Sequence, residues 1–346
     1  MFDNIIVINN KSYDLKILFD LSGRKLVLSE FDNKINAQLH SYQISGINIT
    51  KYNLEKLFSN KQFFNDLTAQ RNEKLNFLFQ EIKDLDVLSF YEQFRPFIDL
   101  LNNKINNQTL ITDLKPNKIA FNPTGSKDGR LTIKKGFLNL FSLPKEERHR
   151  IKCKENFRFV QFDYRSFQPR IAIFLTDNEN FKSSFAHKED IYEGTSDREK
   201  QKLKFFQVTF GKEVSDTLQL RPIFDLRKKI FEEIRTKGKI ISPFGRPIFF
   251  HNEEENVIFR NFITTCESDM IFTAAAKLDI LLNGRQSKIN WIFHDAIMFE
   301  IYKDEISLIK EIKNLMENNY GYFPVKTSIG RTFGELYDLP DRKRCA

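Results

Sequence analysis

Two aspartates stand at the ends of apolar, strand-like segments of this 346-residue chain. Asp163 ends FRFVQFD, and Asp295 lies in the short turn of INWIFHDAIMFEI. If these strands are neighbours, the carboxylates meet at one point, and their repulsion keeps one of them protonated unless cations intervene. Two divalent ions about 3.5–4 Å apart would relieve that repulsion, activate a hydroxyl and stabilise a leaving pyrophosphate. Mg²⁺ suits such a site, with Mn²⁺ as a substitute, because it combines a few carboxylates with substrate phosphates and water.

A cationic and aromatic stripe lies between the two aspartates in the sequence. Its members recur every fourth residue: Arg198, Lys202, Phe206 and Phe210. Ser196 followed by Glu199 forms a capping box, which predicts that a helix begins there. Because four residues turn about 400°, the stripe stays on one face and spans roughly 18 Å. Cations toward a helix N-terminus, followed by flat rings, fit a triphosphate with its sugar and base. The leading hypothesis is therefore nucleotidyl transfer.

The elements that must position these residues are helices and strands in mixed order. Residues 1–50 contain short strand-like runs with turns, which predict a β-rich N-terminal lead-in. Residues 51–110 carry apolar residues at three- and four-residue spacing, which predicts paired amphipathic helices. From residue 111 onward strands and helices mix without the regular alternation of a doubly wound fold. The predicted fold class is α+β.

Composition limits the class of protein further. The net charge of +8 fits a polyanionic partner without proving one. No run of about 20 apolar residues and no signal-peptide pattern occurs, so we expect neither a membrane nor a secreted protein. The cysteines are few and widely spaced, which predicts a reducing compartment such as the cytoplasm or an organelle matrix. The P-loop and GxSxG motifs are absent, which argues against P-loop ATPase and α/β-hydrolase chemistry.

Six segments, in order along residues 110–346, resemble motifs of the family A DNA polymerases. They are TGSKDGRLT, NLFSLP, FDYRSFQPR, REKQKLKFFQVTFG, PFGRP and FHDAIMFEI. FPVKTSIGRTFGE is similar to the closing segment of that family. Each motif is weak alone, but their shared order is specific. The resemblance implies a right-hand polymerase with palm, fingers and thumb around an antiparallel palm sheet, which extends a primer on template DNA with dNTPs.

The resemblance also implies a role for each matching residue. Asp163 and Asp295 would be the catalytic metal ligands. The residues that would contact the nucleotide are Tyr164, Gln168, Arg198, Lys202, Phe206 and Phe210. Primer or template contacts fall to Arg130, Arg170, Arg246 and His294. The thumb-like region would be 51–110, the palm 111–176 and 251–346, and the fingers 177–250, with no proofreading exonuclease in this chain.

Several positions depart from the family pattern. Ala296 stands where the family usually has Glu. Gln168 occupies the position of the sugar-gating Glu, and Phe210 that of its tyrosine partner. An amide facing a ring without a hydroxyl predicts a gate that is bulky but less tightly fixed, so ribonucleotide rejection is in doubt. In TTCESD the family's polar Gln is missing, and Thr264 is the nearest equivalent.

Two other functions remain open from the sequence. One is a single-subunit RNA polymerase-like enzyme, whose corresponding motif also lacks the Glu; the short chain and the GRLT segment count against it. The other is a catalytically inactive nucleic-acid-binding accessory subunit, against which the retained aspartates and cations count. The expected partners are primer–template DNA and dNTPs, together with unidentified replication accessory proteins, and no membrane.

Overall fold

The computed structural model describes most of the chain. The described residues are 5–8, 11–24, 26, 61–82, 86–186, 188–192, 197–211, 220–250 and 253–340. The chain divides into two compact units, Met1–Tyr91 and Glu92–Ala346, which are treated separately below. Most of the predicted lead-in beyond residue 26, and residues 51–60 of the thumb-like region, lie outside the described residues.

The first unit combines a hairpin with helices. Its described elements are β1 (Ile5–Ile8), β2 (Lys11–Asp14), α1 (Leu15–Leu21) and α4 (Lys61–Ile82), and β1 pairs antiparallel with β2. The sequence predicts strands here, whereas 15–21 form a helix. The physical reason is local: Asp14 caps this helix by accepting hydrogen bonds from the backbone N–H groups of Lys16 and Ile17. The buried Leu15 and Leu18 follow helical spacing.

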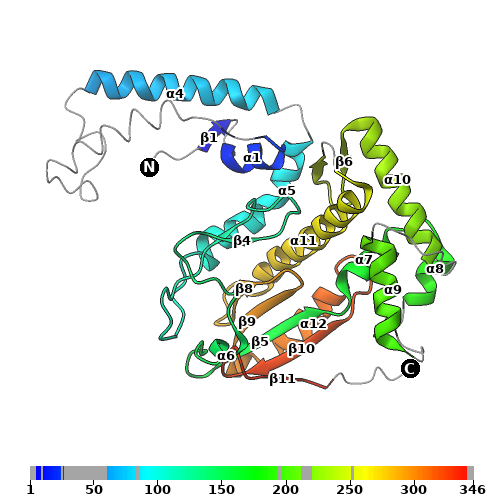
Figure 1. The fold of residues 1–346 in the computed structure, drawn as a ribbon. Helices are drawn as coiled ribbons and strands as arrows, with labels where there is room; N and C mark the ends of the chain where they lie inside the picture. Colours follow the sequence, from blue (N-terminus) through cyan, green and yellow to red (C-terminus); the bar gives the residue numbers. More distant parts are fainter. Residues whose placement is uncertain are drawn as a thin grey trace. The chain divides into compact units, whose positions relative to one another are not determined.

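The second unit is built around a five-stranded antiparallel sheet in the order β11-β10-β5-β9-β8 (Figure 1). The strands are β5 (Phe157–Tyr164), β8 (Lys288–Ile292), β9 (Ala296–Tyr302), β10 (Val325–Gly330) and β11 (Leu336–Asp338). The inner strands are rich in β-branched and aromatic residues, as pleated, packed surfaces favour. The sheet and its mixture with helices confirm the α+β prediction.

Helices surround this sheet. The longer ones are α7 (Phe167–Phe174), α8 (Glu179–Phe185), α9 (Arg198–Phe210), α10 (Arg221–Lys237), α11 (Glu255–Leu281) and α12 (Leu308–Glu317). Short elements are β3 (Phe121–Asn122), β4 (Thr132–Ile133), α6 (Lys145–Arg148), β6 (Lys239–Ile241) and β7 (Pro247–Phe249). Helix α5 (Val87–Leu100) begins in the first unit and continues into a π-helical turn, Leu101–Ile105.

The long helix α11 is the inner support of the second unit. It contacts β8 and β9 as well as α7, α9, α10 and α12 (Figure 1). Sixteen of its residues are buried, on all sides of the helix, which is typical of a core helix. Its buried acids therefore need partners from neighbouring segments, since a buried charge is costly unless it is paired.

One such partner comes from the β6–β7 turn. The guanidinium of Arg246 donates through Nε to Asp269 Oδ1 at 2.7 Å, and its Nη2 lies 2.6 Å from the same oxygen. These side chains are only 7% and 1% exposed. Ser242 from the same turn also donates to Asp269, at 3.3 Å. The pair thus ties the β6–β7 turn to the middle of α11.

We expect Asp269→Ala to lower the free energy of unfolding by about 3–5 kcal/mol, because it leaves the buried Arg246 without the carboxylate. Replacing both residues with Arg246→Met and Asp269→Leu should cost less than that single change. Denaturant unfolding followed by circular dichroism measures all of them. The control is Asp225→Ala, which breaks an exposed ion pair to Arg221 and should cost about 1 kcal/mol or less. Equal losses for Asp269→Ala and Asp225→Ala would contradict the prediction.

Candidate active site

The register of β5 and β9 brings the two strand-end aspartates together. Asp163 on β5 stands opposite Ala296, the first residue of β9, and Asp295 is the residue just before it. The backbone N–H of Tyr164 donates to the carbonyl of Asp295 at 3.0 Å. Burial and the nearby charge of Asp295 raise the pKa of Asp163 to about 7. The predicted pairing of the two strands is confirmed. The charge of Asp295 adds to the effect of burial on Asp163, as expected for two nearby carboxylates.

A cation on the opposite neighbour strand offsets part of this effect. Lys326 on β10 stands opposite Asp163, and its charge acts to lower the pKa of that carboxyl. Its ammonium group also lies 3.0 Å from Asp338 Oδ2. The buried methyl of Ala296 therefore stands on one side of Asp163 and a lysine on the other.

A pocket of about 390 Å³ opens beside Asp295. Its wall contains eight of the residues singled out from the sequence: Arg130, Tyr164, Gln168, Arg198, Lys202, Phe206, His294 and Asp295. They come from β5, α7, α9 and two loops, so only the folded chain gathers them. The carboxylate of Asp295, three cationic side chains and an exposed ring line this cavity, and Asp163 lies beside it on β5. Such a set can hold metal ions, a polyphosphate and a flat base.

Helix α9 presents most of its predicted stripe to this pocket. Arg198, Lys202 and Phe206 line the wall, whereas Phe210 is half-buried and packs against Phe206 with ring centroids 5.6 Å apart. The cap differs from the prediction. Ser196 lies outside the described residues, and it is Asp197 that accepts a hydrogen bond from the backbone N–H of Lys200 at 3.0 Å.

Arg198 is engaged by an acid at the pocket edge. Its Nε donates to Asp190 Oδ2 at 2.6 Å, and its guanidinium lies over the ring of Tyr192, 5.4 Å from the centroid. Arg198 is 52% exposed, so an anion entering the pocket can reach it. Asp190 thus pairs with a guanidinium group that a phosphate could bind in its place.

Two arginines predicted to contact nucleic acid, Arg170 and Arg246, are engaged by partners within the fold. Arg170 is buried and donates to the carbonyls of Arg165, Lys188 and Glu189 at 3.0, 2.5 and 2.8 Å. Burial lowers its pKa to about 10. Arg246 is buried against Asp269, as described above. Neither lines the pocket, because backbone carbonyls or a core carboxylate take their donors, so the structure does not support a direct nucleic-acid contact for either.

The structure adds an acid that the sequence prediction missed. Glu267 on α11 is 3% exposed and lines the pocket. Its Oε2 accepts a hydrogen bond from Gln168 Nε2 at 2.9 Å and one from Arg130 Nη2 at 2.9 Å. Burial raises its pKa to about 7. The sequence contained a signal for this residue: Glu267 lies in a helix that is apolar on most faces. An acid buried in such a helix needs polar partners.

This contact changes the expectation for Gln168. The family resemblance places its amide against the ring of Phe210 and predicts a loosely fixed gate. In the structure the amide is held by Glu267 instead. Thr264, the nearest equivalent of the missing polar Gln, is buried and does not line the pocket.

Aromatic packing holds two further wall residues. The ring of His294 packs against that of Phe141 from NLFSLP in a tilted arrangement, with ring centroids 4.7 Å apart. Burial and Arg130 lower the pKa of His294, which favours the neutral imidazole. Tyr164 stacks on Phe167 at 4.1 Å and donates its hydroxyl to the carbonyl of Met316 at 2.9 Å. Tyr164 therefore offers the pocket its ring and not its hydroxyl.

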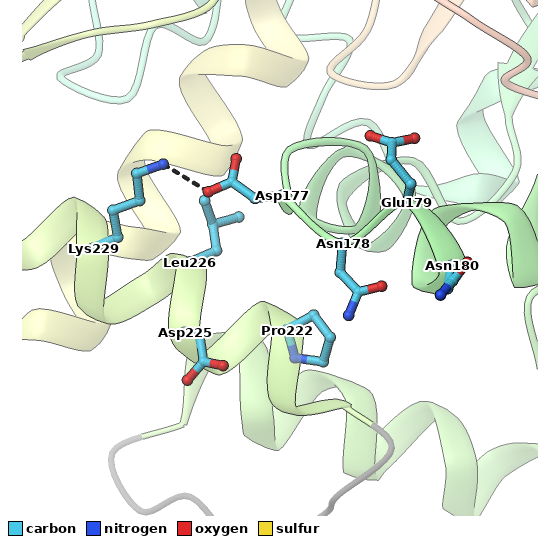
Figure 2. A pocket seen from close by; sticks show the side chains of 8 residues that line it. All are labelled: Asp177, Asn178, Glu179, Asn180, Pro222, Asp225, Leu226 and Lys229. Atoms are coloured by element: carbon cyan, nitrogen blue, oxygen red, sulfur yellow. Dashed lines mark hydrogen bonds and ion pairs between the residues drawn. The ribbon is translucent and has the colours of Figure 1, made fainter.

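A larger pocket of about 570 Å³ lies between α8 and α10 (Figure 2). It is lined by Asp177, Asn178, Glu179, Asn180, Pro222, Asp225, Leu226 and Lys229. Figure 2 shows the ammonium group of Lys229 directed at Asp177, and the ion pair measures 2.7 Å between exposed side chains. None of the residues singled out from the sequence is among them, so size alone does not make this pocket the functional site.

Comparison with known proteins supports a polymerase-like fold. No known protein family matches the sequence. The structure is similar to the polymerase domain of Pol1 from M. smegmatis, solved in complex with a DNA primer-template and dNTP. The TM-score is 0.55 at 16% identity, over 92% of this chain and 67% of that one. At this identity the likeness establishes the fold alone.

Two further observations apply to the described part of the chain. None of its helices is long and apolar enough to cross a membrane. Within the same residues, no group of three or more His, Cys, Asp or Glu side chains gathers as a metal site. A metal ion at the Asp163–Asp295 pair would therefore need ligands from substrate or water.

The raised pKa of Asp163 predicts a pH-dependent stability. Folding raises this pKa from about 3.8 to about 7, so the unfolded state binds fewer protons between these values. The stability that protonated Asp163 contributes to the folded state is fully present below about pH 4 and is lost as the pH rises through 7. In chelator-treated buffer, Asp163→Asn should gain stability relative to wild type between pH 5 and pH 8.

Urea unfolding of both proteins at the two pH values measures this change. The exposed Asp99→Asn variant is the control for removing one negative charge. If the difference in free energy of unfolding between Asp163→Asn and wild type is the same at pH 5 and pH 8, the prediction is contradicted.

Proposed function

We propose that this chain extends the 3′ end of a DNA primer on a template with dNTPs by two-metal nucleotidyl transfer. The observation that carries the proposal is the single pocket that joins Asp295, beside Asp163, to Arg198, Lys202 and Phe206. The similarity to a polymerase domain solved with primer-template and dNTP supports it. The central sheet would be the palm and α8 to α10 the fingers, with residues 51–110 as the thumb-like region.

The carboxylate pair fits the proposed metals. Asp163 and Asp295 would hold Mg²⁺ or Mn²⁺, and divalent charge would relieve the repulsion that raises the pKa of Asp163. When bound, the ions supply activation of the primer hydroxyl and neutralisation of charge on the leaving pyrophosphate. The residues present thus match the donor set that Mg²⁺ accepts together with phosphate and water.

The other residues of the pocket bind and orient the nucleotide. Arg198 and Lys202 would take the triphosphate, with Arg198 leaving Asp190 to do so, and Phe206 would pack on the sugar or base. The primer 3′ oxygen then attacks the α-phosphorus in line, a phosphodiester forms, and the bond to the β-phosphate breaks to release pyrophosphate. Positioning and fixed charges supply most of the acceleration.

The nucleic acid would be held through its phosphates. Arg130 and His294, at the pocket wall, are the described residues placed to meet the primer end. The net charge of +8 suits phosphate contacts, whose affinity falls steeply with salt. We place this activity, without proofreading, in the cytoplasm or an organelle matrix, with accessory proteins still to be identified.

Primer extension with Mg²⁺ tests the function. Wild type should extend with dNTPs, and Asp163→Asn and Asp295→Asn should each lower the rate by roughly 10²–10³-fold or more. The matched control is Asp177→Asn in the pocket of Figure 2, which should retain the wild-type rate. Extension with NTPs alone would favour the RNA polymerase-like alternative. No extension with either nucleotide would overturn the proposal and favour an accessory binding subunit.

The cationic stripe gives a second test. Lys202→Ala should lower kcat/KM for dNTPs by about 10–100-fold, because it removes one charge-assisted contact to phosphate. Steady-state extension kinetics measure the loss. The control is Lys200→Ala, an exposed lysine of the same helix that does not line the pocket. Equal effects of the two substitutions would show that only overall charge matters.

A further inference from the structure

Glu267 is placed unlike the other acids of the pocket. It lies inside α11 at 3% exposure and also lines the pocket, whereas Asp295 is exposed. One oxygen, Oε2, accepts both the amide of Gln168 and the guanidinium of Arg130 at 2.9 Å. Both donors are themselves wall residues. A buried acid thus connects two side chains that face the substrate space.

The contact restricts Gln168 more than ordinary packing would. Gln168 is the second residue of α7, two positions after Ser166, whose φ of 50° is in the left-handed region. The backbone of α7 therefore fixes the position of the Gln168 Cα atom, and the hydrogen bond to Glu267 fixes the position of the amide group. Arg130 holds the carboxylate from a third segment, so the acid itself cannot easily move. The result is a rigid polar wall made of Gln168, Glu267 and Arg130.

The position of this wall indicates which part of a nucleotide meets it. Phosphates would contact Arg198 and Lys202, and the reacting α-phosphate would lie at Asp295. The sugar joins that phosphate to the base, so it must lie in the same cavity. Tyr164, which also lines the wall, donates its hydroxyl to the carbonyl of Met316 and presents only its ring. The Gln168–Glu267–Arg130 wall is a fixed polar surface of this cavity, which suits contact with the sugar.

We propose that Glu267 is a specificity-determining positioning residue, which locks Gln168 against the sugar of the incoming nucleotide and thereby favours deoxyribose over ribose. This inference rests on the proposed polymerase function. A locked side chain cannot withdraw to admit an added 2′-hydroxyl, whereas a mobile one can. Differences of this kind in a binding pocket are worth about 10–200-fold in kcat/KM.

A charge exchange tests the contact itself. The ratio of kcat/KM for dNTP to that for NTP is measured for wild type, Gln168→Glu, Glu267→Gln, and the double variant that carries both changes. Gln168→Glu places two carboxylates together, and Glu267→Gln removes the charge that holds both donors. Each single change should lower the ratio about tenfold. The double variant restores one carboxylate and one amide, and should recover the wild-type ratio to within about threefold.

Two further variants separate positioning from folding. Glu267→Ala should lower the ratio as much as Gln168→Ala, because both remove the fixed wall. Glu317→Gln is the control, since Glu317 is a buried acid that binds the backbone N–H of Val325 and does not line this pocket. It should change thermal stability without changing the ratio.

The outcomes are distinguishable. If wild type extends with dNTPs but the ratio is unchanged in the single variants, or both substrates lose activity in parallel, Glu267 is structural only and the inference fails. A double variant no better than the worse single variant also overturns it. If wild type does not use dNTPs at all, the proposed function fails first.

Discussion

The antiparallel pairing of β5 with β9 is the constraint on which the rest of the site depends. It places Asp163 beside the residue that follows Asp295, and it does so with backbone hydrogen bonds that neither carboxylate can undo. Burial on β5 and the nearby charge of Asp295 together raise the pKa of Asp163. Under the proposed function, positive charge added at this position would stabilise the ionised carboxylates.

The second constraint is the burial of α11. A helix buried on nearly every side can carry acids only where other segments supply donors, and two of its acids are matched in this way. Asp269 receives Arg246 from the β6–β7 turn, and Glu267 receives Arg130 and Gln168. The first pair serves architecture and the second reaches the pocket. Packing in the core and the shape of the substrate wall are therefore set by one element.

The parts of the site that the sequence predicts are those governed by local periodicity. Asp163 ends an apolar strand and Asp295 lies in the turn before one, while Arg198, Lys202 and Phe206 follow a helical repeat. Local backbone geometry therefore fixes the direction of each set, and the tertiary fold gathers most of them at one pocket. Two of the predicted nucleic-acid contacts, Arg170 and Arg246, find partners in the fold that are distant in sequence or set by the tertiary structure. Arg170 and Arg246 have the right sequence context, but carbonyls of 188–189 and the carboxylate of Asp269 take their donors. The contacts of long side chains depend on the tertiary structure, so they cannot be predicted from residue spacing alone.

The described charges around the pocket are largely balanced before any ligand enters. Arg198 is paired with Asp190, Arg130 with Glu267, and Lys326 opposes Asp163 across the sheet. A bare anion would have to displace Asp190 and would still meet the carboxylates at Asp295. A nucleotide that brings divalent cations would avoid both unfavourable interactions. The metal ions would neutralise the aspartates, and the triphosphate would replace Asp190 as the partner of Arg198. Under the proposed function, these charges would favour a metal–nucleotide complex over either component, which is the form of substrate that two-metal transfer requires.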